Sequence, residues 1–192
     1  MKLELLWIKK QLKNRTFRLF SAIGIIVGIA LCIEFVLFSY SILKVIRYLI
    51  LLAVLGIIAW IDQHERRIPN RILLILLWIR IVLLIMEWIL IPSMGMPLLI
   101  SSLLGLLLGG GMFLLAHFIT RGGVGMGDVK LFAVIGTYVG GGSIMALVFL
   151  TALASAFYSI VMLIRKKIKL KEEIPFAPFV LIGTILTMAL GM

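Results

Sequence analysis

The chain contains two aspartates, Asp62 and Asp128, and each stands at one end of a long apolar run. Asp62 closes the run "LAVLGIIAWID", and Asp128 opens another within "RGGVGMGDVKLF" at 121–132. Two carboxylates brought to one level by separate helices can form a dyad, because like-charge repulsion in a poorly solvated site leaves one of them protonated. The ionised partner can then take a proton from water while the protonated partner polarises a peptide carbonyl. The pair therefore predicts hydrolysis of a peptide bond by two carboxyl groups.

Four glycines crowd the segment ahead of Asp128, namely Gly122, Gly123, Gly125 and Gly127. Because glycine has no Cβ, these residues let backbone approach backbone closely and leave N–H groups free for an extended substrate strand. The alternative is that Asp128 only N-caps a helix and that Asp62 ends one for solubility. For either residue alone that structural role is favoured, whereas the two together, with no third aspartate, favour catalysis.

The composition predicts an integral membrane protein. Hydrophobic residues make up 63% of the 192 residues and charged residues 14%, whereas soluble domains carry about a quarter charged residues. No cleavage site follows the first apolar run, so we expect that run to stay as an anchor. The single cysteine, Cys32, lies in an apolar run, which excludes an intrachain disulfide and a cysteine-based zinc site.

The net charge of +11 does not indicate nucleic-acid binding. A nucleic-acid binder gathers its cations on a soluble face, whereas here they sit in short segments between apolar runs. Such a distribution is typical of positive-inside topology and of attraction to anionic lipid headgroups. We therefore expect membrane lipid as a partner and no nucleic acid.

Seven apolar runs predict a polytopic, all-α helical bundle of about seven transmembrane helices. A spanning helix needs roughly 20 apolar residues. Residues 19–61 would extend roughly 64 Å as a helix, so they must cross twice, and we expect a turn near Lys44 to Arg47. The "GGGS" at 140–143 separates two further crossings. The runs are 19–43, 48–61, 72–91, 98–119, 131–140, 143–164 and 174–191.

The charges predict a cytoplasmic N-terminus and an outer C-terminus. With seven crossings, nearly all Lys and Arg fall on the inner side, and both aspartates lie there at similar depth. Residues 1–18 alternate apolar and basic side chains, which suits a helix on the inner membrane surface, the alternative being a disordered tail. We expect residues 1–44 to form this segment plus one additional transmembrane helix, and residues 45–192 to form the membrane core.

Three motifs in this core resemble the type IV prepilin peptidases and their archaeal preflagellin relatives, which are membrane aspartic proteases with a Gly-x-Gly-Asp signature. "GMGDVKL" at 125–131 resembles that signature and its continuation, "IDQHERRIPN" at 61–70 resembles the first aspartate segment, and "IPFAPFVLIG" at 174–183 resembles the entry into the last helix. The resemblance covers roughly residues 45–191. It implies catalytic roles for Asp62 and Asp128.

The resemblance also implies the partners and the location. The substrate is expected to be a prepilin, pseudopilin or preflagellin whose short leader ends in Gly ahead of a hydrophobic helix. Cleavage is expected at the cytoplasmic face of the inner (cytoplasmic) membrane. No cofactor or metal is expected to take part. Many bacterial members carry paired CxxC motifs and methylate their product. The chain has no CxxC motif, so we expect the compact, peptidase-only form. Substrate-binding roles are implied for Gly125, Gly127, Lys130, Pro69 and Pro175.

Other hydrolase and nucleotide-binding motifs are incomplete. "HERRI" at 64–68 has isoleucine where the zinc motif HExxH requires its second histidine. The predicted topology places Ser143 and His117 on opposite sides of the membrane, which excludes their pairing in a serine protease. The glycine-rich stretch lacks the spacing of a nucleotide site.

One alternative belongs to a different class. A transporter or channel with a glycine-broken helix could expose Asp128 to an ion, and the intramembrane charges Glu34, Glu87 and Arg80 would serve it. Both glutamates fall in the outer half, remote from the aspartates, and pairing with Arg80 is the simpler explanation for them. An internal repeat, expected for a transporter, is not evident.

Overall fold

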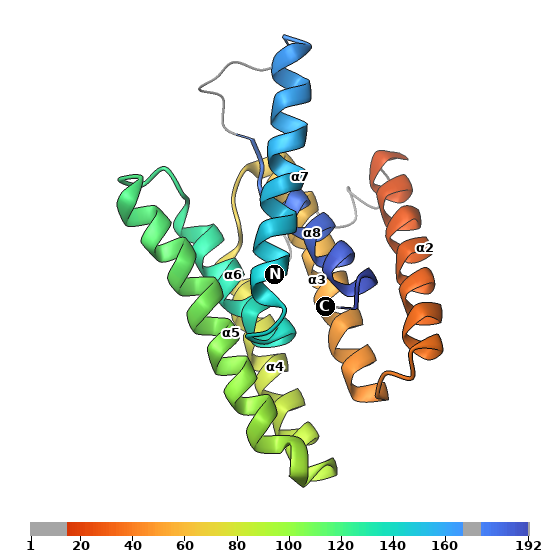
Figure 1. The fold of residues 1–192 in the computed structure, drawn as a ribbon. Coiled ribbons are helices and arrows are strands. Elements are labelled where there is room, and N and C mark those ends of the chain that lie inside the picture. Colours follow the sequence, from red (N-terminus) through yellow and green to blue (C-terminus); the bar gives the residue numbers. More distant parts are fainter. Residues whose placement is uncertain (1–14, 167–173, 192) are drawn as a thin grey trace, which may run out of the picture. The chain divides into compact units, whose positions relative to one another are not determined.

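The computed structural model describes residues 15–166 and 174–191, and within them the regular structure is entirely helical (Figure 1). Five of the helices, α2 to α5 and α7, are long and apolar enough to cross a membrane. The shorter α6 and α8 extend about 21 Å and 20 Å at 1.5 Å per residue. The predicted fold class, a polytopic all-α membrane protein, is confirmed. The helices are α2 (Arg15–Leu37), α3 (Ile42–Glu65), α4 (Asn70–Leu90), α5 (Pro92–Ile119), α6 (Met126–Val139), α7 (Ile144–Ile164) and α8 (Ala177–Ala189).

The chain divides into two compact units, residues 1–40 and residues 41–192. The first unit contains α2, an apolar helix followed by Tyr40, whose ring meets the ring of Phe35 edge-on at 5.3 Å. A surface segment was predicted for residues 1–18, and residues 1–14 of it lie outside the described residues. The second unit contains the other helices and both aspartates.

The turn that precedes α3 was predicted too late in the sequence. It lies at residues 38–41, because Ser41 N-caps α3 and its hydroxyl accepts the backbone N–H of Lys44 at 3.3 Å. The expectation that Lys44 and Arg47 occupy an outer turn is therefore wrong, and Arg47 is a buried residue of α3. The break predicted at 140–143 is confirmed, since it separates α6 from α7.

Helix α6 forms the centre of the second unit. It contacts α3, α4, α5 and α7, and its pairing with α5 is the most extensive in the molecule (Figure 1). From Val129 to Val139, all residues of α6 except Lys130 and Ala133 are buried. The two helices approach backbone to backbone, since a Cβ added to Gly105 or Gly136 would collide with the carbonyl group of the other glycine. Small residues permit this close packing between membrane helices, which fixes α6 against α5.

Four helices of this unit are joined by a buried charge cluster, defined here as Arg47, Arg80 and Glu87. Glu87 accepts hydrogen bonds from Arg80 at 2.9 Å and from Arg47 at 3.3 Å. Arg80 also donates to the backbone carbonyl of Thr137 in α6 at 2.8 Å and to the hydroxyl of Ser102 in α5 at 2.9 Å. The pairing of Arg80 with Glu87 that the sequence indicated is confirmed.

Candidate active site

Asp62 lies in the last turn of α3 and is 6% exposed. The helix ends there because Arg66 adopts a left-handed conformation at φ 51° and its N–H donates to the backbone carbonyl of Asp62 at 2.9 Å. The carboxyl oxygen Oδ2 of Asp62 accepts a hydrogen bond from the backbone N–H of Ala177 at 2.9 Å. Ala177 is the first residue of α8, so the positive end of that helix dipole faces the carboxyl group of Asp62.

Asp128 lies in the first turn of α6, ahead of the apolar run that begins at Leu131. Gly125 N-caps this helix, and its carbonyl accepts the backbone N–H of Asp128 at 3.0 Å. Burial of the side chain and the negative charge of Asp62 raise the pKa of the Asp128 carboxyl to about 6, while a backbone hydrogen bond from Gly125 acts in the opposite direction. Asp128 is therefore poised to hold a proton at mildly acidic pH.

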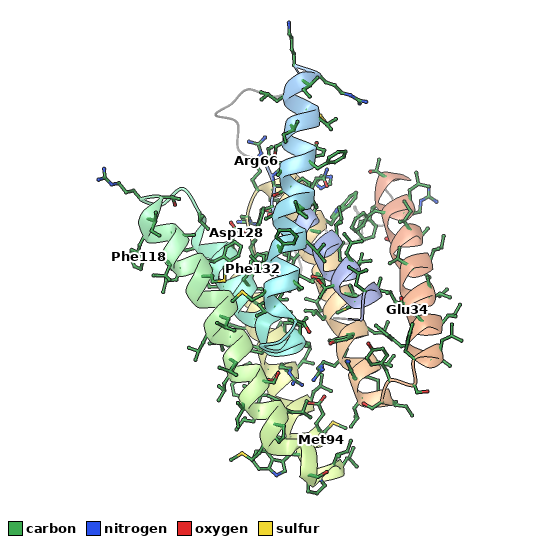
Figure 2. All side chains as sticks on the ribbon, in the orientation of Figure 1. Glu34, Arg66, Met94, Phe118, Asp128 and Phe132 are labelled. Atoms are coloured by element: carbon green, nitrogen blue, oxygen red, sulfur yellow. The ribbon has the colours of Figure 1, made fainter. Side chains whose placement is uncertain are left out.

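Both aspartates line one cleft of about 430 Å³. Its walls come from the ends of α3 and α5, the loop at 120–125, the first turn of α6 and the segment that leads into α8. Figure 2 shows Asp128 and Arg66 in the same part of this unit, away from Met94. Two carboxyl groups thus face the same open space from separate helices. The lining residues are Asp62, Arg66, Phe113, Gly122, Gly123, Val124, Gly125, Asp128, Ile174, Pro175 and Phe176.

The cleft also contains aromatic and basic residues that the sequence did not single out. The ring of Phe113 stacks on that of Phe132 with a centroid distance of 3.8 Å, and the ring of Phe176 lies 6.0 Å from Phe113. These rings provide an apolar wall beside the aspartates. Arg66 adds an exposed cation at the rim. Phe176 stands within the motif at 174–183 and could have been identified there, whereas Phe113 is one of many apolar residues in its helix.

The residues predicted to bind substrate fall into two groups. Gly125 and Pro175 line the cleft. Gly127 faces Ile68, since a Cβ added to it would lie 3.3 Å from the Cβ of that residue. The cleft lining does not include Gly127, Lys130 or Pro69. Lys130 is exposed and donates to Asn70 Oδ1 at 3.2 Å, and Pro69 precedes the first residue of α4.

The rival serine and zinc sites do not assemble among the described residues. His64 Nδ1 lies 2.9 Å from the backbone carbonyl of Trp60 in its own helix. His117, at the end of α5, has Nδ1 2.6 Å from the carbonyl of Val124. Ser143 follows the far end of α6, about 20 Å along that helix from the cleft. In the part of the chain that the structure describes, no hydrogen bond joins either histidine to a serine, and no group of three or more potential metal ligands occurs.

The fold and the cleft define a polytopic helical membrane protein in which two carboxyl groups share one site. A model of the type IV leader peptidase family matches residues 49–160, which include both aspartates. The chain therefore belongs to the type IV leader peptidase family, and the resemblance seen in the sequence is confirmed.

Individual relatives agree with this assignment. The chain is 32% identical over 180 residues to a prepilin leader peptidase/N-methyltransferase of Bacillus subtilis (strain 168), an alignment that covers 90% of this chain and 62% of the relative. A prepilin leader peptidase/N-methyltransferase of Burkholderia pseudomallei (strain 1026b) is 33% identical over 69 residues, which are 36% of this chain and 22% of the relative. The chain thus spans about three-fifths of the length of the Bacillus relative. No solved structure matches it.

Proposed function

We propose that the chain is an aspartic endopeptidase that removes the leader peptide of prepilin-like or preflagellin-like proteins at the cytoplasmic face of the inner membrane. The observation that carries the proposal is the meeting of Asp62 and Asp128 in one cleft, with the charge of Asp62 acting on Asp128. Membership of the type IV leader peptidase family supports the substrate class.

The surroundings of the two aspartates suggest different roles for them. Asp62 accepts the Ala177 N–H, and its negative charge helps to raise the pKa of Asp128, so we assign the ionised role to Asp62. Asp128, whose pKa is raised to about 6, takes the protonated role. This division matches the general pattern in which two carboxyl groups with different surroundings act as acid and base.

The proposed reaction is hydrolysis through a tetrahedral intermediate. Asp62 accepts a proton from a water molecule as the water oxygen bonds to the scissile carbonyl carbon, while Asp128 donates its proton to the carbonyl oxygen. The carbon–nitrogen bond then breaks as the leaving nitrogen takes the proton that Asp62 received. Asp128 recovers a proton from the intermediate as the new carboxyl group forms, so both aspartates return to their starting states.

The shape of the cleft supports an extended substrate. Gly122 to Gly125 form one wall of the cleft, and glycine there leaves steric room for a peptide backbone. The N–H groups of Gly122 and Gly123 already donate to the carbonyls of His117 and Thr120, so this wall offers space rather than free main-chain donors. The rings of Phe113 and Phe176 offer apolar surface for a neighbouring side chain. A scissile bond just ahead of the substrate's hydrophobic helix would reach the cleft in extended form. Moving that bond one helical turn into the apolar segment should abolish cleavage.

Coexpression with a prepilin-like substrate tests the proposal. Mass spectrometry of the substrate's new N-terminus should show cleavage directly after the glycine of the leader, and the product should be absent with Asp62→Asn. Correct cleavage by Asp62→Asn at the wild-type rate would refute the aspartic mechanism. An intact substrate with the wild-type chain would refute the peptidase assignment for that substrate class.

A further inference from the structure

The loop at 120–125 forms one wall of the cleft and joins α5 to α6. Its backbone bends sharply, since Arg121 and Gly122 have φ values of 50° and 92°. Glycine-rich backbone has many accessible conformations, and each restriction costs conformational entropy. A loop that presents a fixed surface beside Asp128 therefore needs a contact that holds it.

His117 provides such a contact from the last turn of α5. Its Nδ1 lies 2.6 Å from the carbonyl oxygen of Val124. Because a carbonyl oxygen only accepts hydrogen bonds, Nδ1 carries the proton and donates it. The hydrogen bond joins the last turn of α5, which precedes the loop, to Val124, the residue before the N-cap Gly125 of α6.

The peptide group between Val124 and Gly125 links this imidazole to Asp128. The described peptide bonds are trans, so the C=O and N–H of one peptide group point in opposite directions. The carbonyl of Val124 points to His117, and the N–H of Gly125 therefore points away from it. A backbone hydrogen bond from Gly125 acts on the Asp128 carboxyl, and a Cβ added to Gly125 would lie 3.1 Å from Oδ2 of Asp128.

We propose that His117 is a positioning residue, which holds the Val124–Gly125 peptide so that the Gly125 N–H faces the carboxyl group of Asp128. The inference rests on the proposed peptidase function. His117 does not line the cleft, so it acts through the loop rather than on the substrate. Loss of its hydrogen bond should lower kcat and leave KM nearly unchanged, because the Gly125 N–H that it holds orients the carboxyl group of Asp128, and that carboxyl group carries out the proposed proton transfer.

Two substitutions at His117 test the hydrogen bond. In Asn, the donor nitrogen is two bonds from Cβ, as Nδ1 is in His, so His117→Asn can still donate to Val124. We expect His117→Leu to lower kcat about tenfold and His117→Asn to stay within about threefold of wild type. His64→Leu is the matched control, because the ring of His64 bonds within its own helix. Equal losses in the Leu and Asn variants, or the same loss in the control, would overturn the proposal.

A double-mutant cycle tests whether His117 acts through the Gly125 N–H. Gly125 has a φ of −66°, which suits proline, so Gly125→Pro removes the N–H while Gly125→Ala keeps it and adds a comparable Cβ. In the Gly125→Ala background, His117→Leu should lower kcat by the same factor as in wild type. In the Gly125→Pro background, it should lower kcat by less than about twofold. Equal costs in both backgrounds would contradict the proposal. If Gly125→Pro has no measurable turnover, the comparison of Leu with Asn at His117 decides.

The outcomes separate this inference from the proposed function. A wild-type chain that leaves a prepilin-like substrate intact, or an active Asp62→Asn variant, would refute the proposed function. An active wild-type chain in which both His117 substitutions lower kcat equally would refute only the positioning role.

Discussion

Helix α6 has a group of buried charges near each end, and the two groups differ in how they are neutralised. Near its C-terminal end, Arg80 donates to the carbonyl of Thr137 and pairs with Glu87, and both side chains are buried. At its N-terminal end, about 14 Å along the helix, Asp128 faces a second carboxyl group, Asp62, across an open cleft. Charges of opposite sign meet at one end and charges of like sign at the other.

This difference separates a structural role from a chemical one. The hydrogen bonds of Arg47, Arg80 and Glu87 offset much of the cost of burying these charges, although Arg47 Nε has no partner among the described residues. They also join α3, α4, α5 and α6. Like charges in one cleft repel each other, and in the proposed function Asp128 retains a proton that the reaction uses. Intramembrane charge alone therefore does not indicate an active site, and the proposal rests on the like sign of the two carboxyl groups in the cleft.

The largest expected effect is a loss of activity when the aspartates at the N-terminal end of α6 are replaced. Asp62→Asn and Asp128→Asn should each lower kcat for a prepilin-like substrate by at least about 1,000-fold, because an amide can neither accept the proton of water nor supply one to the carbonyl. The double variant should be scarcely worse than either single variant, since the two residues act as one unit. Asn is nearly isosteric with Asp, so the melting temperature should change little. Turnover within a few fold of wild type in either variant would show a purely structural role.

Arg80→Met tests the role of the charge cluster near the C-terminal end of α6, and the quantity measured is the stability of the fold. Removing one partner of a buried ion pair should destabilise the fold by about 3–5 kcal/mol, while kcat per folded molecule stays within about threefold of wild type. Arg67→Met is the matched control, because Arg67 pairs with Glu65 at 2.7 Å but its side chain is 75% exposed, so its loss should cost less than about 1 kcal/mol. A collapse of kcat in Arg80→Met at an unchanged melting temperature would assign this cluster to the chemistry.

The pH dependence of turnover should reflect Asp128. With its pKa raised to about 6, Asp128 loses its proton as the pH rises through that value, and with it the group that polarises the carbonyl. We expect kcat to fall about tenfold per pH unit well above pH 6. A pH–rate profile of purified enzyme in detergent provides the measurement. A kcat that stays constant up to pH 8 would show that the proton of Asp128 is not used.

Sequence alone could predict that Asp62 and Asp128 share a site, because they are the only aspartates and each ends an apolar run. The pairing of Glu87 with Arg80 was also predictable, since lone charges within apolar runs need partners. Arg47 was misplaced because the turn was assigned from its charges, whereas the N-cap Ser41 sets the start of the helix. A Ser at this position carries a capping signal that could have corrected the assignment.

Other features of the site had no local signal in the sequence. The donor to Asp62 is the backbone N–H of Ala177, and backbone groups are the same in every residue except proline. The left-handed conformation of Arg66 and the contact of His117 with Val124 depend on how α3 and α5 end. These features arise from tertiary structure, which brings distant segments together around one cleft.

The most direct test of the account is the titration of the aspartates in protein labelled with ¹³C only at Asp, because the chain contains no aspartate besides Asp62 and Asp128. In wild type, the carboxyl signal of Asp128 should titrate with a pKa of about 6. In Asp62→Asn, the one remaining signal should titrate at lower pH, because the negative charge that helps to raise the pKa of Asp128 is gone. The same titration midpoint in both proteins would contradict the claim that the two carboxyl groups act as a coupled pair.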